Sequence, residues 1–244
     1  IWEPKMNIEI DTHTHTVLSG HAHSTLIENA AWAKKAGLSG FVVTDHGPAI
    51  PGAPPDFNLS TLRYLPESID GVRVYHGIEA NIVDFEGTLD IREKYLKLTE
   101  FAIAGIHEAV IRSGGRSRDT DAVIAALQNK YVDTISHPDN PSYTLDYEAV
   151  VKEAARLNKL LEVNDHSFEF RPGGMENAHI YLPLCVRYGV RVVVSSDAHS
   201  AFGMGKFDVA LRALEELNFP EELIVNATKE RFEAYLSERS RRVG

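Results

Sequence analysis

Two histidines at alternate positions lie in the motif Asp11-Thr12-His13-Thr14-His15, directly after the mostly apolar residues 6–10. Successive side chains of an extended strand point to opposite faces, so His13 and His15 share one face and can bind one metal ion. A single pair of this kind is also typical of two solvated loop histidines. The prediction of a metal site therefore depends on which residues follow the other strands.

Polar side chains follow each of seven strand-like segments, and six of these ends carry histidine or carboxylate groups of the metal-ligand type. The candidate ligands are His13, His15, His21, His46, Glu79, His107, His137, Asp197 and His199. Imidazoles with two carboxylates suit zinc, iron or manganese, whereas calcium and magnesium prefer oxygen ligands. Because the set exceeds the needs of two four-coordinate ions, it predicts three divalent ions with open positions for water and substrate.

The elements that must position these residues alternate between short β-branched runs and longer amphipathic stretches. The predicted strands are residues 7–11, 40–44, 72–77, 101–104, 132–135, 160–163 and 190–194. The predicted helices are residues 24–36, 91–98, 120–129, 147–157, 176–188, 206–217 and 220–236. This alternation indicates parallel βα units, and mostly apolar strands favour a barrel over an open sheet. No Gly-x-Gly-x-x-Gly motif follows the first strand, which argues against a dinucleotide-binding fold.

The carboxyl ends of all strands in such a barrel meet on one face, so the candidate ligands are expected to converge on one pocket. We expect a single domain over residues 6–240. Residues 1–5 are expected to be a natural extension or a remnant of cloning. The Pro- and Gly-rich residues 47–55, followed by 56–60, predict a loop that caps the pocket rather than a domain boundary.

Composition narrows the classes of partner. The 244 residues carry a formal net charge of −10 without a long basic run, which argues against a broad nucleic-acid-binding surface. No apolar stretch approaches the roughly 18 residues of a membrane span. Cys185 is the single cysteine, so no internal disulfide can form and a reducing cytoplasm is the expected compartment. Its side chain is predicted to be a small buried thiol.

With these residues in place, the chain resembles the PHP (polymerase and histidinol phosphatase) family, and most closely its stand-alone phosphatases with a trinuclear metal site. The resemblance runs from about residue 6 to about residue 236. It is carried by Asp11-Thr12-His13-Thr14-His15, Thr44-Asp45-His46-Gly47-Pro48, Gly77-Ile78-Glu79-Ala80-Asn81, Ala104-Gly105-Ile106-His107-Glu108, Ile135-Ser136-His137-Pro138 and Ser196-Asp197-Ala198-His199.

The resemblance implies a distorted (β/α)7, TIM-like barrel and a division of the ligands among three ions, zinc being favoured over manganese or iron. The implied sets are His13, His15, Glu79 and Asp197 for the first ion, Glu79, His107 and His137 for the second, and His21, His46 and His199 for the third. The implied activity is hydrolysis of a small phosphomonoester by a hydroxide that bridges two ions, with catalytic roles for Glu79, Asp197 and His199.

Further residues are candidates for contact with substrate or ligands. Arg63 and Arg171 are predicted phosphate anchors because a guanidinium matches phosphate geometry, and His166 is a predicted substrate contact. The backbone amides of residues 203–205 offer another oxyanion contact. Asp11 and Asp45 are placed to orient ligand imidazoles through their second nitrogen.

Other readings stay open. One is a phosphodiesterase or exonuclease on nucleic-acid ends, and another is a histidinol phosphatase. A third is a metal-binding module without catalysis, which intact ligands at every position disfavour. An amidohydrolase is disfavoured because no lysine follows a strand. The expected partner is a small phosphorylated substrate, and a second copy of the chain in a homo-oligomer is a further candidate partner.

Overall fold

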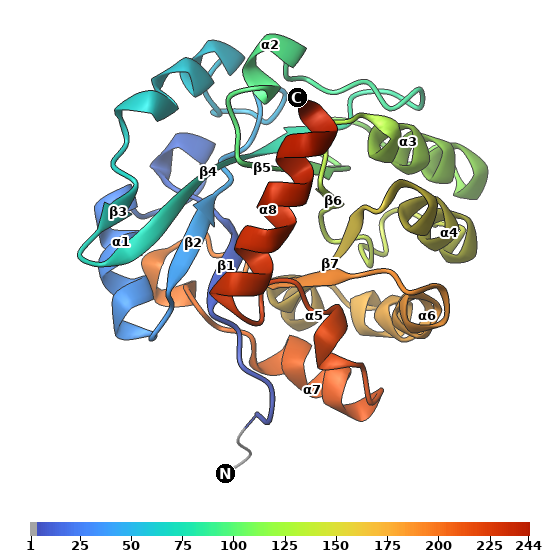
Figure 1. Ribbon diagram of the computed structural model, residues 1–244. Coiled ribbons are helices and arrows are strands. Elements are labelled where there is room, and N and C mark those ends of the chain that lie inside the picture. Colours follow the sequence, from blue (N-terminus) through green and yellow to red (C-terminus); the bar gives the residue numbers. More distant parts are fainter. Residues whose placement is uncertain (1–3) are drawn as a thin grey trace.

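The computed structural model describes residues 4–244, and its centre is a nearly closed barrel of seven parallel strands (Figure 1). In spatial order they are β1 (Ile10–Thr14), β2 (Gly40–Val43), β4 (Val72–Asn81), β5 (Phe101–Gly105), β6 (Thr134–Ile135), β7 (Leu160–Asn164) and β8 (Val192–Ser195). The backbone N–H of His15 donates to Ala198 O at 2.9 Å, which joins the segments after β1 and β8. The predicted single-domain (β/α)7 barrel is confirmed.

Helices surround the strands (Figure 1). They are α1 (Leu26–Lys35), α2 (Glu93–Leu96), α3 (Arg116–Gln128), α4 (Tyr147–Leu157), α5 (Asp165–Phe170), α6 (Gly174–Tyr188), α7 (Asp208–Glu216) and α8 (Lys229–Val243). The 3-10 helices are η1 (Val17–Ser19), η2 (Asp56–Tyr64), η3 (Ala201–Gly203) and η4 (Glu221–Leu223). Among residues 4–244, no helix has both the length and the apolar content that crossing a membrane requires.

Helix α8 covers the amino end of the barrel, opposite the candidate ligands. Its Phe232 ring meets Tyr75 and Phe101 with ring centroids 5.1 and 5.5 Å apart. Farther along, the Arg239 guanidinium donates to Asp133, which precedes β6, at 2.7 Å. With one end of the barrel filled by these side chains, the carboxyl end is left for a ligand site.

Several predicted boundaries differ from the structure. Strand β1 begins three residues later than predicted, because its ladder with β2 starts at the pair Ile10 and Gly40, so His13 lies within the strand. Strand β4 continues to Asn81 and includes Glu79. The short β3 (Ser68–Ile69), antiparallel to β4, was not predicted.

Two segments predicted as loops are helical. Residues 56–60 belong to η2, and the loop predicted after the sixth strand contains α5. The Asn164 side chain caps α5 by accepting from Ser167 N at 2.8 Å. The helix was not predicted because its six residues are too few to show an apolar periodicity. Cys185 is buried as expected, and burial raises the pKa of its thiol. Residues 1–3 of the predicted extension lie outside the described residues.

Candidate metal centre

All nine candidate ligands gather at the carboxyl end of the barrel. Seven of them line a cavity of about 340 Å³: His21, His46, Glu79, His107, His137, Asp197 and His199. The other two, His13 and His15, are fully buried, and their Nε2 atoms lie 3.2 to 3.6 Å from oxygens of both carboxylates. The structure therefore brings together residues that are separated by more than 180 positions in the chain.

Glu79 lies between two groups of histidines, one at each of its carboxylate oxygens. Its Oε2 atom is 3.2 Å from His13 Nε2 and 2.8 Å from His46 Nδ1. Its Oε1 atom is 3.2 Å from both His107 Nε2 and His137 Nε2. A carboxylate with this arrangement can bridge two ions that have separate imidazole ligands.

Asp197 is the second buried carboxylate. Its Oδ1 atom lies 3.2 Å from His15 Nε2, 3.4 Å from His13 Nε2 and 3.5 Å from His199 Nδ1. Asp197 and His137 both have positive φ angles, 51° and 32°. Strained backbone of this kind persists only where surrounding structure imposes it, and it is concentrated at functional sites.

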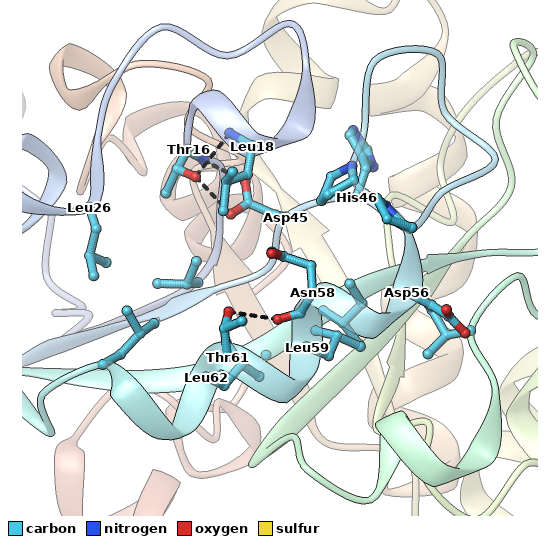
Figure 2. Close-up of a pocket in the computed structure, with 18 residues that line it drawn as sticks. Thr16, Leu18, Leu26, Asp45, His46, Asp56, Asn58, Leu59, Thr61 and Leu62 are labelled. Atoms are coloured by element: carbon cyan, nitrogen blue, oxygen red, sulfur yellow. Dashed lines mark hydrogen bonds between the residues drawn. The ribbon is translucent and has the colours of Figure 1, made fainter.

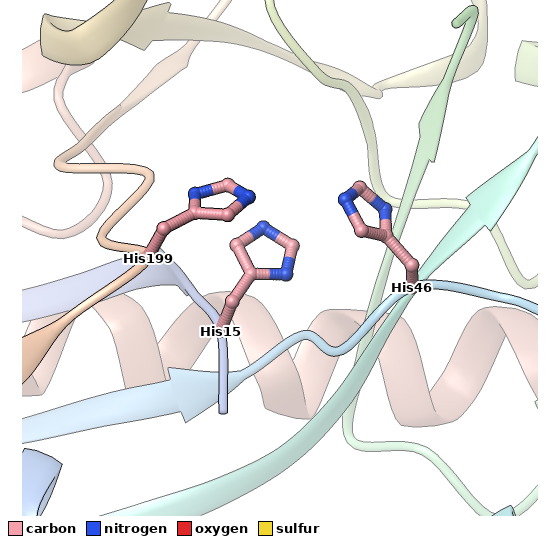
Figure 3. Close-up of side chains that lie close together, drawn as sticks. All are labelled: His15, His46 and His199. Atoms are coloured by element: carbon pink, nitrogen blue, oxygen red, sulfur yellow. The ribbon is translucent and has the colours of Figure 1, made fainter. Parts of the chain in front are cut away.

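A cluster of imidazoles lies at the outer side of the cavity. Figure 3 shows His15 and His199 side by side, with His46 turned toward them from a different segment. The ligand atoms of these three residues all lie within 4.8 Å of one another. The exposed His21 completes the cluster, its Nε2 atom lying 3.0 Å from His199 Nε2.

The unsatisfied polar atoms of this region test whether the residues fit metal ions. Glu79 Oε2, Asp197 Oδ1 and His46 Nδ1 are buried and make no hydrogen bond, although the first and last are only 2.8 Å apart. Buried polar atoms in proteins nearly always have a partner. These three atoms lie close together without hydrogen bonds, and a shared cation would satisfy their lone pairs. The set of oxygen and nitrogen donors therefore fits divalent ions.

The pKa shifts of three of the ligands agree with this fit, whereas that of His13 is shifted the other way. Burial opposes a charge on His13, but the carboxylates of Asp197, Glu162 and Glu79 raise its pKa well above the usual value, so an ion would have to displace a proton from this ring.

Burial and the nearby Arg171 lower the pKa of His137 to about 4, and burial with its histidine neighbours lowers the pKa of His15. Both rings are then neutral near pH 7, with a lone pair available for an ion. Burial opposes ionisation of Glu79, but His13 and its other histidine neighbours lower the carboxyl pKa well below its usual range.

Glu162 is a functional candidate that the sequence reasoning did not select. Its Oε1 atom lies 2.7 Å from His13 Nδ1 and accepts from Ser195 Oγ at 2.6 Å. Its Oε2 atom accepts from the backbone N–H of His137 and from Asn164 Nδ2. The signal was present: a carboxylate stands within the otherwise apolar sixth predicted strand, residues 160–163.

Asp45 and Asp11 act less directly than predicted. Asp45 accepts from Ser19 Oγ at 2.6 Å, and Ser19 Oγ lies 2.9 Å from His15 Nδ1, so Asp45 reaches His15 through Ser19. Asp11 accepts instead from the backbone and hydroxyl of Ser196, beside Asp197. It therefore holds the turn that presents Asp197.

The predicted oxyanion contact at residues 203–205 is wrong. Gly203 N donates to Ser200 O and Met204 N donates to Ala201 O, both within the turn of η3. Gly205 N donates to Asp11 Oδ2 at 3.1 Å. All three amides are thus engaged within the protein, because this segment folds back on itself after β8.

Of the three predicted substrate contacts, only Arg171 lines the cavity around Glu79. Arg171 lines the cavity, and its Nη1 atom is buried without a hydrogen-bond partner. His166 is half-buried, with its ring stacked 6.1 Å from that of His199. Arg63 is exposed on η2, does not line the cavity, and donates to Tyr64 Oη at 2.9 Å.

A second, smaller cavity of about 110 Å³ lies beneath η2. Figure 2 shows Asp45 and His46 along one side, with Leu59 and Leu62 of η2 along the other. The later part of the segment predicted to cap a pocket thus covers a mainly aliphatic space without lysine or arginine, whereas Ile50 and Pro51 of the same segment line the cavity around Glu79. The polar cavity around Glu79 is the better candidate for chemistry.

Comparison with known proteins finds a matching family model and relatives that are named as phosphatases. The model of the PHP domain family matches residues 11–172. A "Probable phosphatase" of Acetivibrio thermocellus is 43% identical over 238 residues, which cover 98% of this chain and 99% of the relative. A second "Probable phosphatase", from Caldanaerobacter subterraneus subsp. tengcongensis, is 43% identical over 242 residues, covering 98% and 95%.

Two solved structures share the fold. One is histidinol phosphate phosphatase from Lactococcus lactis subsp. lactis, complexed with zinc, L-histidinol and phosphate, with a TM-score of 0.57 and 16% identity over 86% of this chain and 92% of that chain. The other is a chain of archaeal ribonuclease P with mature tRNA, with a TM-score of 0.59 and 18% identity over 95% and 91%.

Proposed function

The chain belongs to the PHP domain family, and we propose that it is a metal-dependent phosphatase that hydrolyses small phosphomonoesters at a site for three divalent ions. The observation that carries this proposal is the position of Glu79, whose two oxygens face separate groups of histidines. The names of the relatives support a phosphatase, and the monoester specificity is our inference from the size and single arginine of the cavity.

We assign the ligands to three ions, with zinc favoured and manganese or iron as alternatives. The first is held by His13, His15, Glu79 and Asp197, the second by Glu79, His107 and His137, and the third by His21, His46 and His199. When bound, such ions lower the pKa of water and neutralise charge on a phosphoryl group. Glu79, Asp197 and His199 are the residues that we place at the reacting centre.

The remaining residues bind and orient the substrate. Arg171 lines the cavity, and one of its guanidinium nitrogens has no hydrogen-bond partner, so the side chain can donate to a phosphoryl oxygen as the oxygens gain charge. His166 stands beside His199, where it can contact the group attached to phosphate. A cytoplasmic location and a homo-oligomeric state stay predictions from the sequence.

A hydrolysis panel tests this proposal. Protein reconstituted with zinc or manganese is assayed against glycerol phosphate, p-nitrophenyl phosphate and the diester bis(p-nitrophenyl) phosphate. We expect turnover of the monoesters, at least tenfold slower turnover of the diester, and no activity in Glu79→Gln. The exposed Glu86→Gln variant is the matched control and should behave as wild type. Hydrolysis of diester alone, or full activity in Glu79→Gln, would overturn the proposal.

A further inference from the structure

The loop that follows His46, residues 47–52, is held by a carboxylate that lies outside the cavity around Glu79. Asp90 accepts from the backbone N–H of Ala49 at 2.9 Å, and it is not among the residues that line the cavity. We propose that Asp90 is a positioning residue, which holds this loop so that His46 is in place to bind the third ion. The inference rests on the metal site of the proposed function.

A short hairpin brings Asp90 back to the end of β4. Directly after the strand, Ile82 and Leu89 form an antiparallel bridge. Asp90 N then donates to Asn81 O at 3.1 Å, and Asp90 Oδ1 accepts from Asn81 N at 2.8 Å. Asp90 therefore lies beside the last residue of β4, two positions beyond Glu79.

Asn81 connects Asp90 to the residue that follows His46. Its Nδ2 atom donates to Asp90 Oδ2 at 2.6 Å and to Gly47 O at 3.1 Å. Because one amide nitrogen serves both acceptors, Asp90 fixes the direction in which Asn81 meets Gly47. Gly47 N in turn donates to Glu79 O at 2.9 Å, and His46 and Glu79 form a parallel bridge. These contacts end with His46 beside Glu79, in the orientation that an ion requires.

The loop fits closely against its neighbours at both ends. A Cβ atom on Gly47 would lie 2.7 Å from Asp90 Cγ, far below contact distance. At the other end, a Cβ atom on Gly20 would lie 2.6 Å from the carbonyl carbon of Gly52. Gly20 directly precedes His21, which is a second proposed ligand of the third ion. The loop held by Asp90 therefore contacts both segments that supply these ligands.

Asp90→Asn keeps the size of the side chain but cannot accept from all three of these N–H donors. If the new oxygen faces Asn81 N, the new NH2 group faces two other donors, Ala49 N and Asn81 Nδ2. In the opposite orientation, the NH2 group faces Asn81 N. Because a donor left without a partner costs about 1–3 kcal/mol, we expect the third ion to bind roughly 5- to 100-fold more weakly.

Equilibrium dialysis against chelator-buffered zinc, followed by elemental analysis, measures this affinity without turnover. Wild type should hold about three ions per chain, and Asp90→Asn about two at the free zinc concentration that just saturates the wild type. Adding His21→Ala to Asp90→Asn should remove no further ion, because both changes act on one site. Gly47→Ala is a second variant that should weaken the same ion, since its methyl group displaces Asp90 without removing a hydrogen-bonding group.

Asp84→Asn is the matched control. Asp84 accepts from Glu86 N and Thr88 N within the hairpin that carries Asp90, so this variant also replaces a carboxylate that binds backbone donors. It should hold three ions with wild-type affinity. Raising the zinc concentration should restore kcat/KM in Asp90→Asn by mass action, whereas a folding defect that is independent of zinc would lower activity at every zinc concentration.

The possible results separate the role of Asp90 from the proposed function. Unchanged zinc affinity in Asp90→Asn and Gly47→Ala, or an equal loss in Asp84→Asn, would overturn the positioning role and leave the phosphatase function standing. Wild type that holds three ions but hydrolyses no monoester would overturn the phosphatase function, and the dialysis would still decide the role of Asp90. Fewer than three ions in wild type would overturn the positioning role together with the three-ion site.

Discussion

The Nδ1 atom of His13 lies 2.7 Å from Oε1 of Glu162, and both side chains are almost completely buried. An ionised carboxylate only accepts hydrogen bonds, so this contact keeps the proton of a neutral His13 on Nδ1. The lone pair of Nε2 then faces Glu79 and Asp197, at 3.2 and 3.4 Å. Glu162 thus fixes the ring in the form that can bind an ion.

Glu162→Gln is expected to impair ion binding by His13 while preserving side-chain size. If the NH2 group of the glutamine donates to His13, the ring proton moves to Nε2 and blocks the ligand atom. If the amide oxygen faces His13 instead, the NH2 group faces the backbone N–H of His137, so that two donors oppose each other. We expect a loss of roughly 10- to 100-fold in metal affinity or kcat/KM. Competition with a chelator measures the first, and steady-state kinetics the second.

Ser195→Ala is the matched control for that variant. Ser195 Oγ donates to the same Glu162 oxygen, but its removal leaves the carboxylate free to accept from His13. Metal affinity should therefore change by less than about threefold. Equal behaviour of the two variants would contradict the role assigned to Glu162.

Arg171→Ala should raise KM for phosphomonoesters by roughly 10- to 100-fold, because a hydrogen bond from a charged donor to phosphate is lost. Arg171→Lys should recover part of the loss, since it restores the charge but not the planar fork. Arg63→Ala is the comparison, and its position away from the cavity predicts unchanged kinetics. A larger effect of Arg63→Ala than of Arg171→Ala would reverse the assignment.

Gly105→Ala places a methyl group inside the metal centre. A Cβ atom there would lie 2.5 Å from His107 Cε1 and 2.7 Å from Glu79 Oε1, both far below contact distance. The displaced side chains should cost the second site its ion, so elemental analysis should give about one ion fewer per chain. Circular dichroism checks that the barrel persists, and a full complement of ions in a folded variant would contradict the prediction.

Lys159 predicts a pH dependence of stability at the other end of the barrel. Its ammonium donates to the carbonyls of Asn129, Lys130 and Val132, and burial lowers its pKa from 10.5 to about 7. Between these pH values the unfolded chain binds more protons than the folded chain, so this residue makes the free energy of unfolding rise with pH. The slope is at most about 1.4 kcal/mol per pH unit.

Urea unfolding of wild type and Lys159→Met between pH 7 and 9.5 isolates this contribution. The difference in free energy of unfolding, wild type minus variant, should increase with pH, because methionine carries no titratable proton. A difference that stays constant or falls over this range would show that Lys159 keeps its proton in the folded protein.

The sequence was informative where function depends on the ends of parallel strands. His13, Glu79 and Asp197 could be placed together because every strand of such a barrel delivers its following residues to one edge. Glu162 was not selected, because its role depends on contacts with His13 and Ser195, which lie in other strands and share no local pattern with it.

The ends of strands and helices were harder to predict from the sequence, because they also depend on contacts between distant segments. Strand β1 starts where its ladder with β2 starts, and α5 exists because Asn164 caps it and Asp165 and Ser167 anchor it. Such tertiary interactions override local propensity. The amides of residues 203–205 appeared free in the sequence for the same reason, since their acceptors become visible only in the folded chain.

The number of ions per chain tests the central claim most directly. Elemental analysis of wild type reconstituted with zinc and freed of unbound metal should give about three ions per chain, and Glu79→Ala should lose at least two because both of its oxygens face ligand groups. The control Glu86→Ala should keep three. One ion or none in wild type, or three ions in Glu79→Ala, would contradict a trinuclear centre bridged by Glu79.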